Sequence, residues 1–140
     1  MATLGIRDAF AQYGAKLRNV QWSVSAWAAD GSLVVSMWEH HRRKGTPPGT
    51  LVFEGSASRW RGAGNNEFRE NVDAAFRAGT PVCLVIARTD EIARVEAGED
   101  GSKIKKEFFL KEEVVGKVTE WDGEHYAITF TRRCAARPRI

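Results

Sequence analysis

Hydrophobic and polar residues alternate along several stretches of the chain, which is the pattern of strands with one buried face. Residues 20–28 and 33–40 are rich in β-branched and aromatic side chains and flank a Gly-containing turn, so they predict a hairpin. Further strands are predicted over residues 51–53, 81–89, 105–110, 114–121 and 125–131. The last two are joined by Asp122-Gly123, which is a strong hairpin signal.

One of these predicted strands is apolar without alternation. Every residue from 82 to 87 is hydrophobic, which is typical of a strand that is covered on both faces. Cys83 lies within this run, where a thiolate would be costly. We therefore expect Cys83 to be a small buried hydrophobic residue and not a nucleophile.

Helical spacing predicts two helices, over residues 3–13 and 65–78. Gly14 and Gly79 follow them as stops, and Asn65 or Asn66 is expected to cap the second helix. The second helix carries an apolar stripe formed by Phe68, Val72 and Phe76. We expect this stripe to pack against residues 82–87.

Together the predicted elements define an α+β fold. We expect a mostly antiparallel curled sheet, or a small β-barrel, of six or seven strands with two helices, because closure removes the edges of a short sheet. The length of 140 residues suits one domain. We therefore expect a single globular domain over residues 1–131 and a basic C-terminal tail over residues 132–140.

Charge is small on average but unevenly distributed, with a net value of +3. Residues 1–64 hold eight basic and four acidic residues, residues 65–131 hold nine and fourteen, and residues 132–140 hold four and none. A local cationic patch binds phosphate whatever the average charge is, so the two basic ends favour a nucleic-acid partner. A merely solvated tail accounts for the last segment equally well.

Several classes of protein find no support in the sequence. No apolar run reaches the ~18 residues of a membrane helix, and the N-terminus lacks the pattern of a signal peptide, so we expect a cytoplasmic protein with no membrane partner. The two cysteines, Cys83 and Cys134, form neither a disulfide framework nor a zinc-type spacing. There is no phosphate-binding loop and no nucleophile elbow, so we expect no cofactor and no enzymatic activity.

Histidine placement also argues against a metal site. His40 and His41 could both donate to a metal, but adjacent residues of a strand point to opposite faces of the sheet. His125 is remote from them in the sequence. We therefore expect neither metal ligands nor catalytic residues.

Aromatic residues on the predicted first hairpin are the most informative feature. Of the five tryptophans, Trp22, Trp27 and Trp38 lie on this hairpin, and its two faces both carry an indole. At least one of the three is therefore expected to be partly exposed in a concave pocket. Polar neighbours that could read the edge of a stacked base are Asn19, Gln21 and Ser23.

Basic residues lie close to these tryptophans along the chain. Arg42, Arg43 and Lys44 follow directly after the second strand of the hairpin and are candidates for binding phosphates. Arg59 and Arg61 flank Trp60 and form a second candidate contact. In the competing interpretation, the tryptophans are ordinary core residues and the basic run is a solvated loop.

The segment from Arg18 to Ala26, followed by Val35-Ser36-Met37-Trp38, resembles the N-terminal accessory module found upstream of HNH-type nuclease domains in bacterial restriction-like proteins. The resemblance extends over about residues 18–90 and departs at Val24 and Ser25, where that module has Trp and Gly. The chain has no HNH half, so the likeness implies recognition without catalysis. The resemblance implies a DNA-associated accessory domain of the PUA-like barrel kind, which examines modified bases.

These observations predict a non-enzymatic nucleic-acid-binding module that reads a base in an aromatic pocket. The alternative is a protein–protein adaptor that uses exposed aromatics and the acidic segment 89–100, and a small enzyme is a third hypothesis. The first two differ in where the basic residues lie relative to the tryptophans. A shared surface favours nucleic acid, and scattered positions favour the adaptor.

Overall fold

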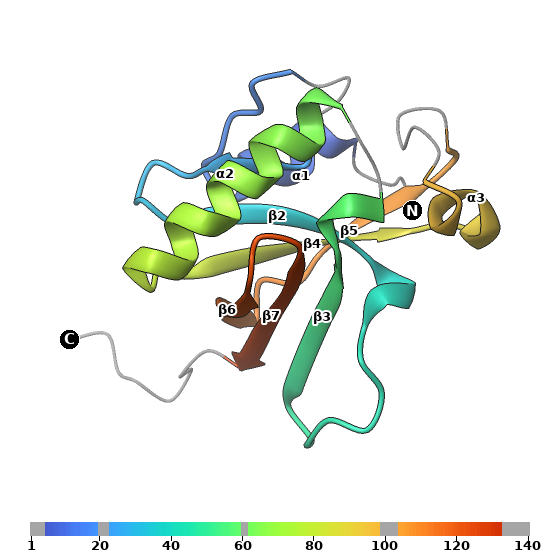
Figure 1. Cartoon of the computed structure of the whole chain (residues 1–140). Coiled ribbons are helices and arrows are strands. Elements are labelled where there is room, and N and C mark those ends of the chain that lie inside the picture. The colour runs from blue at the N-terminus through green and yellow to red at the C-terminus, as the bar shows by residue number, and fades with distance from the viewer. Residues whose placement is uncertain (1–4, 20–22, 60–61, 99–103, 133–140) are drawn as a thin grey trace.

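The computed structural model describes residues 5–19, 23–59, 62–98 and 104–132 (Figure 1). Seven strands, three α-helices and two 3-10 helices lie within these residues. In chain order they are α1 (Ile6–Gln12), β1 (Ser25–Trp27), β2 (Leu33–Trp38), η1 (Glu39–His41), β3 (Thr50–Ser56), η2 (Ala57–Arg59), α2 (Ala63–Ala78), β4 (Val82–Arg88), α3 (Ile92–Glu96), β5 (Glu107–Leu110), β6 (Val114–Trp121) and β7 (His125–Arg132). The α+β class and the number of strands are therefore as predicted.

The seven strands form one mixed sheet in the order β1-β2-β4-β6-β7-β3, with β5 also paired to β4. Most pairs are antiparallel, as predicted, and both expected hairpins, β1–β2 and β6–β7, are present. The exception is β2 with β4, which are parallel from Leu33 opposite Val82 to Trp38 opposite Ala87. A parallel pair requires a long crossover, and here the connection contains β3 and α2.

The prediction of a curled sheet or a small barrel is wrong, because the sheet is neither closed nor strongly curled. Its two ends are β1 and β3, which lie at opposite limits of the strand order. The physical reason is that helices cover the apolar faces, so the sheet does not need to fold onto itself to bury them. Figure 1 shows α2 lying across one face of the sheet and α3 beyond the end of β4. The short helix α3 is additional to the two predicted helices.

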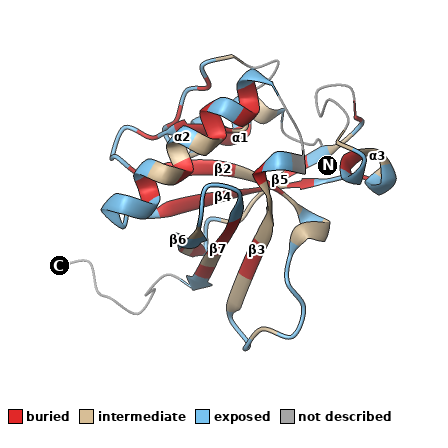
Figure 2. Cartoon of the chain, viewed as in Figure 1, coloured by how far each residue is buried: buried red, intermediate tan, exposed pale blue. Residues whose placement is uncertain are grey.

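Two clusters of buried residues lie on the two faces of the central strands. Figure 2 shows that β2 and β4 are buried over most of their length. On the α2 side, Leu33 and Val35 of β2 and Val82 and Leu84 of β4 join α2 and the strands β3, β6 and β7. On the α1 side, the alternate residues of β2 and β4 pack with α1 and β5. The strand β4 is thus covered on both faces, and Cys83 within it is buried, as predicted.

The second helix differs from its prediction at both ends. It begins at Ala63 after Gly62, whose φ of +117° favours glycine, so the expected cap by Asn65 or Asn66 is wrong. Asn65 is buried in the first turn, and its side-chain amide donates to the carbonyl of Ala57 at 2.6 Å. This bond ties the start of α2 to the preceding η2.

The expected apolar stripe of α2 is right for two of its three residues. Phe68 and Val72 are buried, but Phe76 is 41% exposed, and Ala75 lies in the core instead. At 100° per residue, position i+7 lies about 20° from the direction of Phe68, whereas position i+8 lies about 80° away. Phe76 therefore points past the edge of the sheet, and the expectation that it packs against β4 is wrong.

The first hairpin is shorter than predicted. Strand β1 covers only Ser25–Trp27, and β2 ends at Trp38, where η1 begins. Conversely β3 is longer than predicted and reaches Ser56. Within the described part of the chain, no helix is long and apolar enough to cross a membrane.

Candidate nucleic-acid interface

A fork in the sheet creates a cleft. One edge of β4 pairs with β2, so β5 and β6 must share the other edge. Along that edge, β6 pairs only with Val82, and β5 pairs with the four residues from Val85 to Arg88. The cleft beyond this fork has a volume of about 420 Å³ and is lined by residues of β3, β4, β5 and the η1 segment. This volume lies within the range of small-molecule sites.

The lining combines an apolar surface with several cations. Leu51 and Ile86 supply apolar surface from β3 and β4, above the buried ring of Phe53, and Phe109 of β5 supplies a half-buried aromatic ring. The charged residues of the lining are Glu39, Arg42, Arg88 and Lys111. Three cations against one carboxylate make this cleft suited to a ligand with an apolar and an anionic part.

Arg88 is held in a fixed plane within this lining. Its Nε and Nη2 donate to the two carboxylate oxygens of Glu39 at 3.0 and 2.9 Å, and its guanidinium carbon lies 4.7 Å from the centre of the Phe109 ring. The hydrogen bond from Arg88 lowers the pKa of Glu39 below its ordinary value, and the same bond raises the pKa of Arg88. The result is a planar cation placed over an aromatic ring in the lining of the cleft.

The three basic residues after β2 lie in different surroundings. Arg42 is exposed, and its backbone bridges to Phe53, while its guanidinium forms no hydrogen bond or ion pair with the described residues. Lys44 is also exposed. Arg43 is engaged by Glu54, whose pKa it lowers through a hydrogen bond. Among the three predicted phosphate-binding residues, Arg42 and Lys44 are therefore the two that remain available to bind a phosphate.

Trp27 is 40% exposed, as the alternation of the hairpin predicted for at least one indole. Its Nε1 donates to Oδ1 of Asn71 on α2 at 3.0 Å. It lies opposite Leu33, at the far end of β2 from Arg42, and five steps along a strand span about 17 Å. The exposed tryptophan and the cationic run are therefore at opposite ends of the hairpin, and Trp27 does not line the cleft.

The other predicted pocket residues do not converge either. Trp38 is half-buried and packs with the α1-side cluster. Ser23 is buried, and its Oγ accepts the backbone N–H of Asn19 at 3.1 Å in a local turn. Gln21, Trp22 and Arg61 lie outside the described residues, as does the side chain of Arg59 in η2. The structure thus brings no base pocket together from the described tryptophans.

The side chains of His40 and His41 point to the same residue, whereas the sequence predicted that they point to opposite faces of a strand. His40 and His41 both place Nε2 against Oε2 of Glu96 on α3, at 2.9 and 2.6 Å. The prediction assumed a strand, but these residues lie in η1, where one residue turns the chain by about 120° and not by 180°. The argument against a metal site from opposite faces is therefore wrong.

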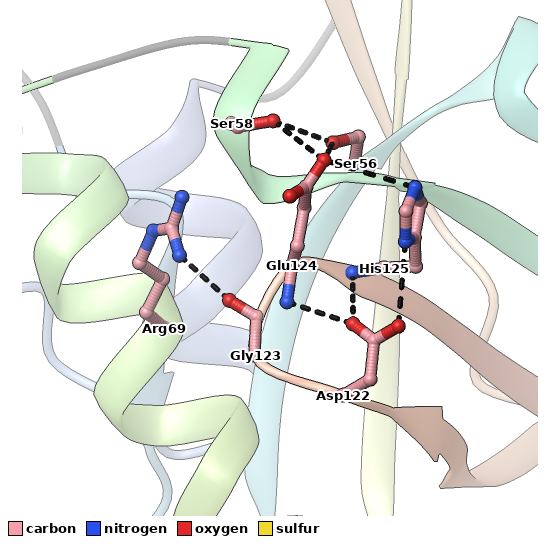
Figure 3. Close-up of polar contacts among 7 residues, drawn as sticks. All are labelled: Ser56, Ser58, Arg69, Asp122, Gly123, Glu124 and His125. Atoms are coloured by element: carbon pink, nitrogen blue, oxygen red, sulfur yellow. Dashed lines mark hydrogen bonds and ion pairs between the residues drawn. The ribbon is translucent and has the colours of Figure 1, made fainter.

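A third polar cluster joins the β6–β7 turn to β3 and η2 (Figure 3). Ser56 and Ser58 donate their hydroxyls to Oε2 of Glu124 at 3.2 and 3.0 Å, and Asp122 accepts the backbone N–H groups of Glu124 and His125. These N–H groups lower the pKa of Asp122. A serine nucleophile needs its hydroxyl bonded to a base such as histidine, whereas here both hydroxyls bond to a carboxylate. The contacts fix the hairpin against its neighbours.

No family model, no curated protein and no solved structure matches this chain significantly. The resemblance to the accessory module of HNH-type nucleases therefore stays a prediction.

Sequence reasoning missed the cleft residues Arg88, Phe109 and Lys111. One signal was present, because an Arg directly after an apolar strand marks the point where that strand leaves the core. The adjacent pair Phe108-Phe109 is a second signal, since neighbouring strand residues face opposite ways and one aromatic must lie away from the α1-side core.

Proposed function

We propose that the protein is a non-enzymatic module that binds single-stranded nucleic acid in the cleft at the sheet fork. A base enters the cleft and stacks beside Phe109 and Arg88, while Arg42 and Lys44 bind the adjacent phosphates. The observation that carries the proposal is the planar Arg88 guanidinium, held over the Phe109 ring next to the available cation Arg42.

The stacking part is supported by the rigidity of Arg88. Bases stack on aromatic rings and on the planes of arginine guanidinium groups, with about 1–3 kcal/mol per stacked base. A free arginine loses side-chain entropy when it takes up such a position. The two hydrogen bonds that Arg88 donates to Glu39 already restrict its side chain, so less entropy is lost on binding.

The phosphate part is supported by the charge that the cleft leaves uncompensated. Glu39 pairs with Arg88, and Lys111 pairs with Glu113 at 2.7 Å, whereas Arg42 forms no ion pair with the described residues and is only a weaker charge partner of Glu39. Lys44 lies two residues further along the same segment and is exposed. One cation in the lining of the cleft, followed two residues later by a second exposed cation, suits the repeating base and phosphate of a single strand.

The adaptor hypothesis has less support from the described residues. Of the acidic segment, Glu91 pairs with Arg94 at 2.6 Å and Glu96 bonds to both histidines of η1, which leaves Asp90 as its exposed carboxylate among the described residues. The exposed large apolar side chains, Trp27, Phe76 and Ile92, come from three different elements.

The test is a titration of single-stranded oligonucleotides at several salt concentrations. Replacing Arg42 by Gln should weaken binding to all sequences alike and reduce the slope of log K against log salt by about one unit or less. Arg77→Gln is the matched control, because Arg77 is an exposed arginine of α2 that pairs with Asp73, and it should leave the slope unchanged. Absence of measurable affinity of the wild-type protein at low salt would overturn the proposal and favour the adaptor.

A further inference from the structure

The two histidines of η1 and the carboxylate of α3 bring three potential metal ligands to one point. Within the part of the chain that the structure describes, His40, His41 and Glu96 are the one group of three such residues whose ligand atoms all lie within 4.8 Å of one another. We propose that these residues bind a divalent transition-metal ion of the Zn²⁺ class, through Nε2 of both histidines and Oε2 of Glu96. The proposal is independent of nucleic-acid binding.

The distances are close to those of a metal site without its ion. Both imidazole nitrogens contact the same carboxylate oxygen, at 2.9 and 2.6 Å. Around a tetrahedral ion with bonds of about 2.0–2.2 Å, ligand atoms are about 3.3–3.5 Å apart. The two nitrogens would therefore move away from the carboxylate oxygen by about 0.4–0.9 Å to admit the ion, which side-chain rotation can supply.

The ligand types indicate which ions fit. Two imidazoles with one carboxylate form one of the ligand sets found in zinc sites with three protein ligands and an open fourth position. Imidazole nitrogens also suit Cu²⁺, Ni²⁺ and Co²⁺, whereas Mg²⁺ and Ca²⁺ prefer oxygen ligands. We therefore expect selectivity for transition metals over Mg²⁺ and Ca²⁺.

The surroundings fix the rings and leave a path for the ion. The side chains of His40 and His41 are only 18% and 10% exposed, and their ring centres lie 4.5 Å apart in an edge-to-face arrangement. Trp38 packs against His40 with ring centres 6.1 Å apart. The Glu96 side chain is 49% exposed, so solvent reaches the carboxylate and can occupy the fourth position.

A metal at this site would join two elements that are far apart in sequence. The 3-10 helix η1 follows β2, and α3 follows β4, and both lie at the same end of the sheet in Figure 1. A helix of five residues such as α3 is marginal by itself, so most of its stability must come from contacts with the rest of the fold. A metal bridge between α3 and η1 should therefore raise the thermal stability of the whole chain.

The experiment titrates the full chain, freed of metal by a chelator, with Zn²⁺ by calorimetry and with Co²⁺ by absorption. We expect one ion per chain, a visible Co²⁺ spectrum of a low-coordinate site that Zn²⁺ abolishes, and a rise in Tm with Zn²⁺ but not with Mg²⁺. His41→Ala and Glu96→Gln should each weaken Zn²⁺ binding at least about tenfold. Glu96 is largely exposed, so Glu96→Gln should fold even if His41→Ala does not.

Two control variants separate this site from other ligands of the chain. His125→Ala removes the remaining histidine, which lies on the exposed β6–β7 hairpin, and Cys134→Ser removes the second cysteine. Both should bind Zn²⁺ as the wild type does. Stoichiometric binding that survives His41→Ala and Glu96→Gln, or that is lost in either control, would overturn the proposal. So would a wild-type chain that does not bind Zn²⁺ or Co²⁺ at all.

Discussion

Gly116 shows how a single residue determines the shape of the sheet. It lies opposite Phe130 of β7 and is also the residue through which β6 pairs with Val82 of β4. A Cβ atom at this position would lie 2.5 Å from the Phe130 ring and 2.8 Å from the carbonyl oxygen of Thr129. The absence of a side chain thus lets the Phe130 ring lie over β6 at the point where the fork begins.

We predict that Gly116→Ala destabilises the fold by about 1–3 kcal/mol, because the added methyl group overpacks a fully buried site. Lys117→Ala, at the next and exposed position of the same strand, is the control and should change stability by less than about 0.5 kcal/mol. Denaturant unfolding of the two variants measures the difference. Equal and small effects would show that Phe130 does not lie over Gly116.

At this scale the sequence predicted burial better than it predicted contacts. The buried state of Cys83 follows from its apolar neighbours alone, because an unbroken apolar run is typical of a strand covered on both faces. The engagement of Arg43 by Glu54 could not be predicted, since it depends on β3 returning beside the segment that follows η1. Contacts of this kind are determined by the tertiary arrangement and not by local pattern.

Among the elements, α2 shows both the value and the limit of helical periodicity. The spacing of Phe68 and Val72 predicted the buried face, and this face does pack on the sheet. The helix is also fixed from outside the core, because Nη1 of Arg69 donates to the carbonyl of Gly123 at 2.7 Å and Nε1 of Trp121 donates to Asp73 at 3.1 Å. The same helix has Ala75, and not Phe76, in the core.

We predict a large difference between the two phenylalanines of α2. Phe68→Ala should destabilise the protein by about 3–5 kcal/mol, because the ring is buried and lies edge-to-face against Tyr126 with centres 5.1 Å apart. Phe76→Ala should cost about 1 kcal/mol or less, because its side chain is largely exposed. Denaturant unfolding of both variants provides the comparison. A cost for Phe76→Ala as large as that for Phe68→Ala would contradict the observed rotation of the helix.

The segment η1 marks the limit of strand prediction. Residues 33–40 alternate as a strand does, but β2 pairs with β4 only as far as Trp38 opposite Ala87. Beyond that point the chain turns toward β3, and the turn brings two neighbouring histidines to the same side. Periodicity cannot locate such an end, because the end depends on where the partner strand stops.

For the whole molecule, the pairing of distant strands determines the architecture. Local hairpins were predictable, because turn residues such as Gly123, with φ of +98°, lie between alternating segments. The parallel pair of β2 with β4 and the open sheet were not, since they depend on how α1 and α2 share the two faces. The cleft combines four separated segments, so no single stretch of sequence could reveal it.

The central claim is that a base binds in the cleft and not at the exposed tryptophan of the first hairpin. The most direct measurement compares Phe109→Ala with Trp27→Ala by fluorescence anisotropy of one labelled single-stranded oligonucleotide at fixed low salt. We predict that Phe109→Ala weakens binding by ~1–3 kcal/mol, about 5- to 150-fold, and that Trp27→Ala changes it by less than about twofold. Loss of affinity in Trp27→Ala with no loss in Phe109→Ala would contradict the claim and would indicate that the base binds at the first hairpin.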